Sequence, residues 1–265
     1  MSISYDEAVA PFEYGEGSDY VIALHGYTGS PYELRQLGQY LATHGFHVLA
    51  PCLPGHGKKK EELIKTRWTD WWDFVRQIIE TINAQEPKHV FITGLSLGGA
   101  LSLYAAAQYS IITAVAPICA LVNTKRMDRL LFNLVGKRFT YIPTRKKSYY
   151  YFDVQDRSLL EDPIFQEYYE RFNKEPAPVV ASIFELLDNV KQELPKIKQP
   201  TLLFQARKDR MILPSSGSFV LEQIGTSPEE KALIWLEQSG HVATMDYNKE
   251  QVFLNITQFF ERYCK

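Results

Sequence analysis

The sequence is organised around one short motif, Gly94-Leu95-Ser96-Leu97-Gly98-Gly99. It follows an apolar run at residues 89–93, which is typical of a buried strand, and opens a small, apolar segment at residues 97–109 that predicts a helix. A Gly-x-Ser-x-Gly motif at a strand-to-helix turn holds the serine on a sharp bend with its hydroxyl presented. Glycines two residues before and after it avoid collisions with neighbouring backbone. We therefore expect Ser96 to be a nucleophile; the alternative is a glycine-rich turn with an incidental serine.

Similar apolar runs recur on both sides of this motif. Predicted strands lie at residues 20–24, 46–50, 89–93, 112–117, 201–205 and 232–236. Their nearly continuous hydrophobicity is typical of parallel strands buried on both faces. Helices are predicted between them at residues 32–43, 69–84, 97–109, 214–223 and 249–263. This alternation predicts an α/β fold, with a mostly parallel central sheet flanked by helices.

One interval breaks the alternation. About 80 residues separate the strand ending near residue 117 from the one beginning at residue 201, whereas a simple crossover needs about a dozen or somewhat more. The interval contains helix-like segments of its own, at residues 165–172 and 179–190. We therefore predict an inserted cap, or lid, subdomain at residues 121–198, over a core formed by residues 1–120 and 199–265.

Composition excludes several classes of protein. The 265 residues contain 29 Lys and Arg against 31 Asp and Glu, for a net charge of −2, so no overall basic field favours nucleic acid. The three cysteines, Cys52, Cys119 and Cys264, are odd in number and widely spaced, which argues against a disulfide framework and a metal site. We find neither a signal-peptide pattern nor an apolar run of about 18 residues, so we expect a cytoplasmic protein.

A serine nucleophile of this type needs an acid and a histidine that follow it in the chain. Of the six histidines, only His241 lies beyond the motif, in the loop after the last predicted strand. Asp209 follows the strand at residues 201–205, where a carboxylate can orient His241 and stabilise the imidazolium. The alternatives for the acid are Asp246, five residues from His241, and Asp188, inside the insert.

Ester chemistry at a serine also needs donors for the oxyanion. The N–H of Leu97, at the start of the predicted helix, supplies one. The segment His25-Gly26-Tyr27-Thr28-Gly29 follows the strand at residues 20–24, and its glycines allow the Tyr27 N–H to supply the second. His56, in the loop after the next strand, is expected to be structural.

With these motifs in place, the chain resembles the α/β-hydrolase superfamily, and more narrowly its bacterial monoacylglycerol lipase and carboxylesterase branch. The resemblance rests on four segments in the family's order: His25-Gly-Tyr-Thr-Gly-Ser-Pro31, Leu53-Pro-Gly-His-Gly57, Gly94-Leu-Ser-Leu-Gly-Gly99 and Ser239-Gly-His-Val-Ala-Thr-Met-Asp-Tyr247. It implies a triad of Ser96, Asp209 and His241, and an oxyanion hole of the Tyr27 and Leu97 N–H groups. It also implies a cap over the site and no metal or organic cofactor.

The expected reaction is hydrolysis of a small carboxylic ester through an acyl-enzyme on Ser96. A thioesterase, an amidase or an acyltransferase could use the same residues, and a non-catalytic ligand-binding protein of this fold is a further alternative. A dehalogenase-type enzyme is excluded, because it needs an aspartate in place of Ser96.

The insert bears on the substrate. Between residues 123 and 152 there are eight Lys and Arg and one acid, Asp128, interleaved with aromatic residues. Such a segment suits contact with a lipid surface, or else it faces the more acidic segment at residues 153–175. An aromatic-rich cap also favours an apolar acyl pocket and a monoacyl substrate. The sequence makes no prediction of oligomeric state.

Overall fold

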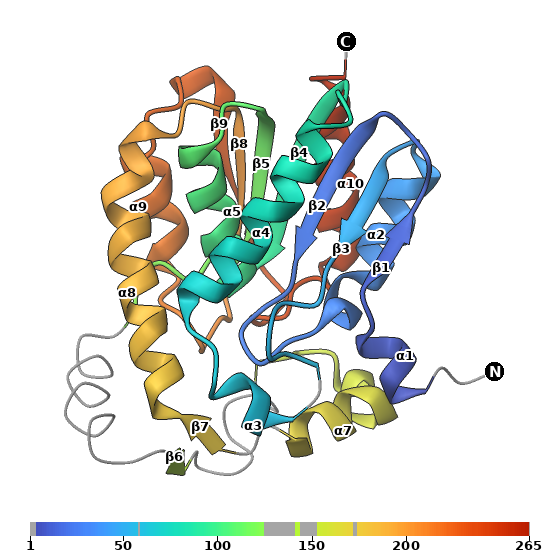
Figure 1. Cartoon of the computed structure of the whole chain (residues 1–265), viewed down its shortest axis with the longest axis vertical. Helices are drawn as coiled ribbons and strands as arrows, with labels where there is room; N and C mark the ends of the chain where they lie inside the picture. The colour runs from blue at the N-terminus through green and yellow to red at the C-terminus, as the bar shows by residue number, and fades with distance from the viewer. Residues whose placement is uncertain (1–3, 58, 125–140, 144–152, 172–173, 265) are drawn as a thin grey trace.

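The computed structural model describes residues 4–57, 59–124, 141–143, 153–171 and 174–264. Its centre is a seven-stranded sheet in the order β1-β3-β2-β4-β5-β8-β9 (Figure 1). All neighbouring strands are parallel except β1, which runs antiparallel to β3. The strands are β1 Phe12–Tyr14, β2 Asp19–Leu24, β3 His47–Ala50, β4 His89–Leu95, β5 Ile112–Ile118, β8 Thr201–Ala206 and β9 Lys231–Leu236.

All six predicted parallel strands are confirmed. The seventh, β1, was not predicted, because three residues are too few to show a period. In the register of the sheet, Leu24 pairs with Gly94, and Gly94 pairs with Pro117. The ends of β2, β4 and β5 are therefore level, so the loops that follow them meet at one edge of the sheet.

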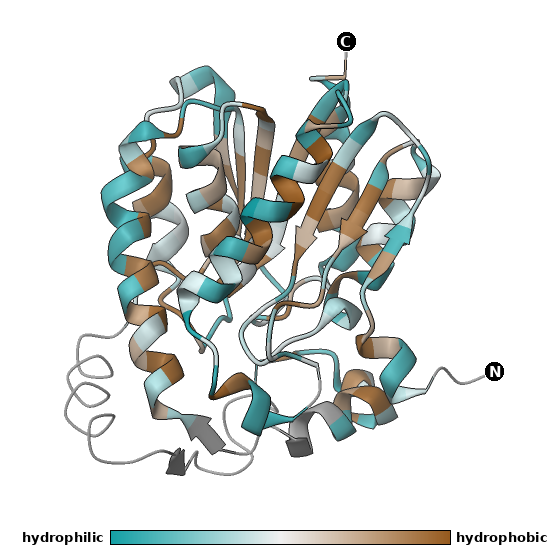
Figure 2. Ribbon diagram, in the orientation of Figure 1, coloured by the Kyte–Doolittle hydropathy of each residue, from teal (hydrophilic) through white to brown (hydrophobic). Residues whose placement is uncertain are grey.

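Helices cover both faces of the sheet. One face carries α4 Trp68–Asn83, α5 Leu97–Gln108, α8 Ala177–Glu193 and α9 Ser215–Gln223, and the other carries α2 Arg35–Thr43 and α10 Lys249–Glu261. Successive residues of a strand serve opposite faces: Ile22 belongs to the first core cluster and Val21 to the second. Figure 2 shows the result, with apolar residues on the strands and polar residues on the outer helix surfaces.

The predicted helix at residues 32–43 is divided in two. A 3₁₀ turn, η1 (Pro31–Leu34), precedes α2, and the Arg35 N–H donates to the Tyr32 carbonyl at their junction. The remaining short elements are α1 Tyr5–Val9, α3 Lys60–Leu63, β6 Tyr141–Pro143, η2 Arg157–Glu161, α7 Pro163–Arg171, β7 Lys174–Pro176, η3 Leu194–Lys196 and η4 Pro228–Glu230.

The insert between β5 and β8 contributes to two regions. Strands β6 and β7 form a separate antiparallel pair and, with α7, lie beyond the carboxyl edge of the main sheet (Figure 1). Helix α8 instead packs against α4 and α5, where its Ile183, Leu187 and Val190 are buried in the first core cluster. The cap predicted at residues 121–198 stays a prediction, and the packing of α8 leads us to propose that it ends near Pro176 rather than at residue 198. The basic segment at residues 123–152 lies almost entirely outside the described residues.

Candidate active site

Ser96 occupies a strained turn between β4 and α5. Its φ of 55° falls in the left-handed region, which residues with a side chain rarely adopt. The backbone around it is held on both sides: the Ser96 N–H donates to the Ile118 carbonyl at 2.9 Å, and the Ser96 carbonyl accepts from the Leu121 N–H at 2.9 Å. The contacts of β5 and its following loop thus maintain a conformation that the local chain would not favour.

The two glycines flanking Ser96 are required by close packing. A Cβ at Gly94 would lie 2.4 Å from the Gly98 carbonyl carbon. A Cβ at Gly98 would lie 2.0 Å from the Leu24 carbonyl oxygen. The steric argument made from the sequence is confirmed, and it explains how the first turn of α5 approaches the end of β2 so closely.

His241 and Asp209 meet at the same edge of the sheet. Asp209 follows β8 and His241 follows β9, and Nδ1 of His241 lies 2.9 Å from Oδ2 of Asp209. Oδ1 of Asp209 accepts from the N–H groups of Met211 and Ile212, at 2.9 and 3.0 Å. Because the carboxylate can only accept at Oδ2, Nδ1 of His241 is the donor, and in the neutral ring Nε2 is the unprotonated nitrogen.

Neither alternative acid is placed in this way. The Asp246 carboxylate accepts from four backbone N–H groups, those of Gly240, Gln155, Asp156 and Tyr247, at 2.7 to 2.9 Å. It therefore ties the His241 loop to the segment that begins at residue 153. Asp188 lies on α8, the helix packed against α4 and α5.

The loop after β2 carries the Tyr27 N–H, the second oxyanion donor expected from the sequence. The Gly26 carbonyl accepts from the Gly29 N–H at 3.0 Å and lies 2.9 Å from Nδ1 of His25. In a trans peptide the next N–H points the opposite way, so the Tyr27 N–H is directed away from this turn. Leu97 is the first residue of α5, and its N–H has no acceptor within the helix.

His25 and His56 support this loop. Nε2 of His25 accepts from the Leu53 N–H at 3.0 Å, and the two imidazole rings lie 5.0 Å apart. Burial lowers the pKa of His56 to about 4, so its ring is neutral. The structural role expected for His56 agrees with these contacts.

Within the described part of the chain, three carboxylates act electrostatically on His241, and the sequence analysis identified only Asp209. Burial by itself lowers the pKa of His241, but Asp209, Asp153 and Glu33 together raise it above its ordinary value. Burial in turn raises the pKa of Asp153 to about 6 and that of Glu33 to about 7. Glu33 was a polar residue in a predicted helix and Asp153 one acid of a long insert, so the sequence carried no signal for either.

Among the described residues, two groups of side chains have atoms spaced as metal ligands. Cys119, Asp209 and His241 form the first, but a metal there would displace the hydrogen bond between Asp209 and His241. Asp19, His89 and Cys264 form the second, where Nδ1 of His89 already lies 2.7 Å from Oδ1 of Asp19. Burial raises the pKa of the Cys119 thiol well above its usual value, which argues against a nucleophilic role for it.

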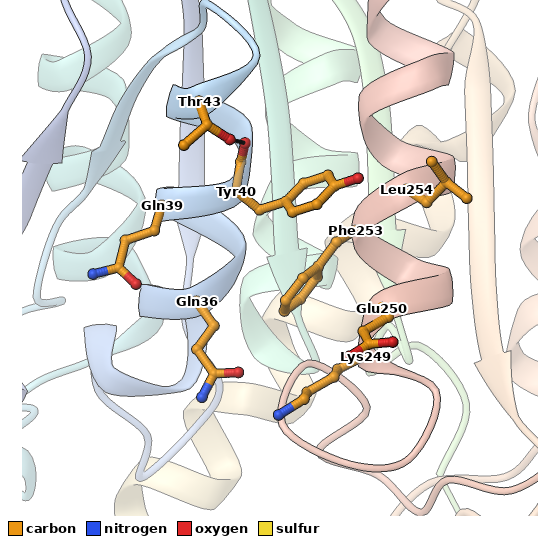
Figure 3. A pocket seen from close by; sticks show the side chains of 8 residues that line it. All are labelled: Gln36, Gln39, Tyr40, Thr43, Lys249, Glu250, Phe253 and Leu254. Atoms are coloured by element: carbon orange, nitrogen blue, oxygen red, sulfur yellow. Dashed lines mark hydrogen bonds between the residues drawn. The ribbon is translucent and has the colours of Figure 1, made fainter.

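Ser96 and His241 open into one cavity of about 80 Å³. It is lined by Gly26, Tyr27, Glu33, Leu95, Ser96, Leu121, Met211, Ile212, His241 and Val242. A larger groove, of about 600 Å³, lies between α2 and α10, where Tyr40 and Phe253 extend toward each other (Figure 3). The groove contains none of the predicted site residues, so the smaller cavity is the candidate active site.

The sheet is mostly parallel, with a serine on a strained strand-to-helix turn and a His–Asp pair on the loops after its last strands. This combination defines an α/β hydrolase with a serine nucleophile. Comparison with known proteins agrees. Residues 16–248 match the family described as serine aminopeptidase, S33, and the chain belongs to that family.

Its relatives include esterases and lipases. It is 30% identical over 253 residues to a carboxylesterase of Bacillus subtilis (strain 168), covering 95% of this chain and 96% of that one. It is 29% identical to a thermostable monoacylglycerol lipase of Bacillus sp. (strain H-257), covering 96% and 95%. A solved structure from work on LipS and LipT, two metagenome-derived lipolytic enzymes, superposes with a TM-score of 0.85 at 27% identity, covering 96% and 98%.

Proposed function

We propose that this protein hydrolyses carboxylic esters through an acyl-enzyme on Ser96, with His241 as general base and Asp209 as the residue that orients it. The observation that carries this proposal is the 2.9 Å hydrogen bond between His241 and Asp209, beside a cavity that also contains Ser96 on its strained turn. The relatedness to a carboxylesterase and a monoacylglycerol lipase along nearly the whole chain supports the same reaction.

The reaction proceeds in two halves. Ser96 Oγ attacks the acyl carbon while Nε2 of His241 takes its proton, and the tetrahedral oxyanion lies against the N–H groups of Tyr27 and Leu97. His241 then protonates the departing alcohol, which leaves the acyl group on Ser96. Water, activated by His241, releases the acid and restores Ser96. The Asp209 carboxylate stabilises the imidazolium formed in each half.

For the substrate, we propose a small ester with one apolar acyl group, such as a monoacylglycerol. Support comes from the cavity wall, where Leu95, Leu121, Met211, Ile212 and Val242 provide apolar surface next to Ser96. Apolar lining with a few convergent polar groups is the usual composition of such a site. The relative from Bacillus sp. (strain H-257), a monoacylglycerol lipase, is consistent with this substrate class.

The test is an activity profile with a covalent probe. We expect turnover of p-nitrophenyl esters and of monoacylglycerols, and labelling of Ser96 by a fluorophosphonate. Acyl-CoA and an aminoacyl p-nitroanilide serve as comparison substrates for thioesterase and aminopeptidase activity. If an aminoacyl p-nitroanilide or an acyl-CoA is turned over much faster than every ester, the proposed reaction is wrong. A preference for acetyl over octanoyl esters would contradict the proposed acyl group.

Contact with membranes is a narrower question. None of the described helices combines the length and hydropathy that crossing a bilayer requires. Peripheral lipid contact by residues 123–152 and a cytoplasmic location both stay predictions. Cosedimentation with anionic vesicles at low and high salt tests the first, because electrostatic binding weakens as salt rises.

A further inference from the structure

Glu33 is a buried carboxylate in the wall of the candidate active site. It lies on η1 with 8% of its surface exposed, and it lines the cavity that contains Ser96 and His241. The catalytic steps proposed above do not use it. A carboxylate is costly to bury unless it is bonded, so its contacts indicate what it does.

Its main contact is with the loop proposed as the oxyanion hole. Oε2 of Glu33 accepts from the Gly26 N–H at 3.0 Å. It also packs so closely against Gly29 that a Cβ there would lie 2.4 Å from Oε2. The carboxylate therefore sits inside the turn formed by residues 26–29.

The position of this bond along the backbone is informative. The Gly26 carbonyl is fixed by the Gly29 N–H and by the His25 ring, and Glu33 fixes the Gly26 N–H. Both peptide groups of Gly26 are thus held, although glycine has more backbone freedom than any other residue. The peptide group on the carbonyl side carries the Tyr27 N–H, the proposed oxyanion donor.

We propose that Glu33 is a positioning residue of the oxyanion hole, holding the Gly26 N–H so that the Tyr27 N–H is directed at the reacting carbonyl oxygen. This inference rests on the proposed function. Because the donor is a backbone group, its direction depends on what restrains the loop. Glu33 is a side chain from outside the loop that binds Gly26.

Glu33 has a second effect, through its charge. When it is ionised, the Glu33 carboxylate raises the pKa of His241, and the charge of His241 acts on Glu33 in return. The neighbouring ionisable groups Tyr32 and Asp162 bond to each other. On α7, Ile164 and Phe165 line a small cavity together with Glu33, and both are apolar. Removing the charge but not the acceptor should therefore shift the pH dependence of kcat/KM and leave the hydrogen bond to the Gly26 N–H in place.

Three variants separate these effects. Glu33→Met removes the acceptor at similar side-chain length, and Glu33→Gln keeps an acceptor oxygen without the charge. Tyr32→Phe is a matched control on the same turn, because it removes only the Tyr32 hydroxyl, which bonds to Asp162. Glu33→Ala replaces Glu33→Met if the methionine variant does not fold. Each folded variant is assayed for kcat and KM on a p-nitrophenyl ester, for the rate of fluorophosphonate labelling, and for amide hydrogen exchange in residues 25–29.

We expect Glu33→Met to lower kcat and the labelling rate together by about 10- to 100-fold with little change in KM, since loss of a whole oxyanion donor costs about 10²–10³. Exchange in residues 25–29 should accelerate. Glu33→Gln should recover most of the loss, and the acidic limb of its kcat/KM profile should move to lower pH. Tyr32→Phe should leave kcat and loop exchange as in the wild type.

Two results would overturn the inference. One is a folded Glu33→Met protein with wild-type kcat and unchanged loop exchange. The other is a Glu33→Gln protein as impaired as Glu33→Met. Failure of the proposed function has a different signature. The wild type itself would show no ester turnover and no labelling at Ser96, while amide hydrogen exchange in residues 25–29 would still report on the hydrogen bond between Glu33 and Gly26.

Discussion

Substitution of two aspartates by asparagine should separate catalysis from stability. In Asp209→Asn, the N–H groups of Met211 and Ile212 require an acceptor where Oδ1 now lies. The amide oxygen therefore remains there, and the new NH₂ group faces Nδ1 of His241. A donor at that position favours the imidazole tautomer with its proton on Nε2, which cannot accept the Ser96 proton. In a serine protease this change costs about 10⁴ in kcat, or about 5 kcal/mol of transition-state stabilisation.

Asp246→Asn should have the opposite profile. An asparagine has one acceptor oxygen, so it can keep only two of the four backbone bonds made by the two carboxylate oxygens. Hydrogen bonds to charged groups contribute about 1.5–3 kcal/mol each, which gives a loss of about 3–6 kcal/mol. For a chain of this size that lowers Tm by roughly 10 °C. The folded fraction should keep kcat within about tenfold of the wild type.

The assay pairs turnover of a p-nitrophenyl ester with thermal unfolding of the same preparations. We expect Asp209→Asn to unfold near the wild-type temperature and to be almost inactive. The reasoning is refuted if folded Asp246→Asn loses 10³-fold or more in kcat, or if Asp209→Asn stays within tenfold of the wild type.

Four further outcomes follow from the site. Ser96→Ala should lower kcat by at least about 10⁴ and abolish fluorophosphonate labelling with Tm little changed; normal turnover by the folded variant would exclude the acyl-enzyme. Because the surrounding carboxylates raise the pKa of His241, and only neutral imidazole is a base, kcat/KM should rise with pH through a pKa above about 6.5, the ordinary value. Asp153→Asn should move that limb to lower pH, and an unchanged profile would contradict the charge coupling. Gly98→Ala should lower stability by about 4 kcal/mol or more, measured by denaturant unfolding, since its Cβ would meet the Leu24 carbonyl at 2.0 Å.

The parts of the site fixed by local chain geometry were predictable. Ser96 could be proposed as the nucleophile because its turn, its two glycines and the start of α5 lie within a few consecutive residues, so the steric constraints follow from the motif itself. The strands were predictable for a similar reason: burial on both faces leaves a continuous apolar run in each. The 3₁₀ turn η1 and the strand β1 were missed because each is too short to establish a period.

The sequence by itself determined the α/β alternation, the nucleophile turn and the short set of candidates for its partners. Only the tertiary structure distinguished those candidates by their contacts. Asp209, Asp246 and Asp188 are the same residue type, so the sequence does not distinguish them. Their contacts depend on how the loops after β8 and β9 approach each other at the sheet edge. There Asp209 bonds to the ring of His241, whereas Asp246 accepts from four backbone N–H groups. Glu33 joins the site for the same reason: its contact with Gly26 depends on the angle at which η1 folds back over the β2 loop, and no residue pattern records that angle.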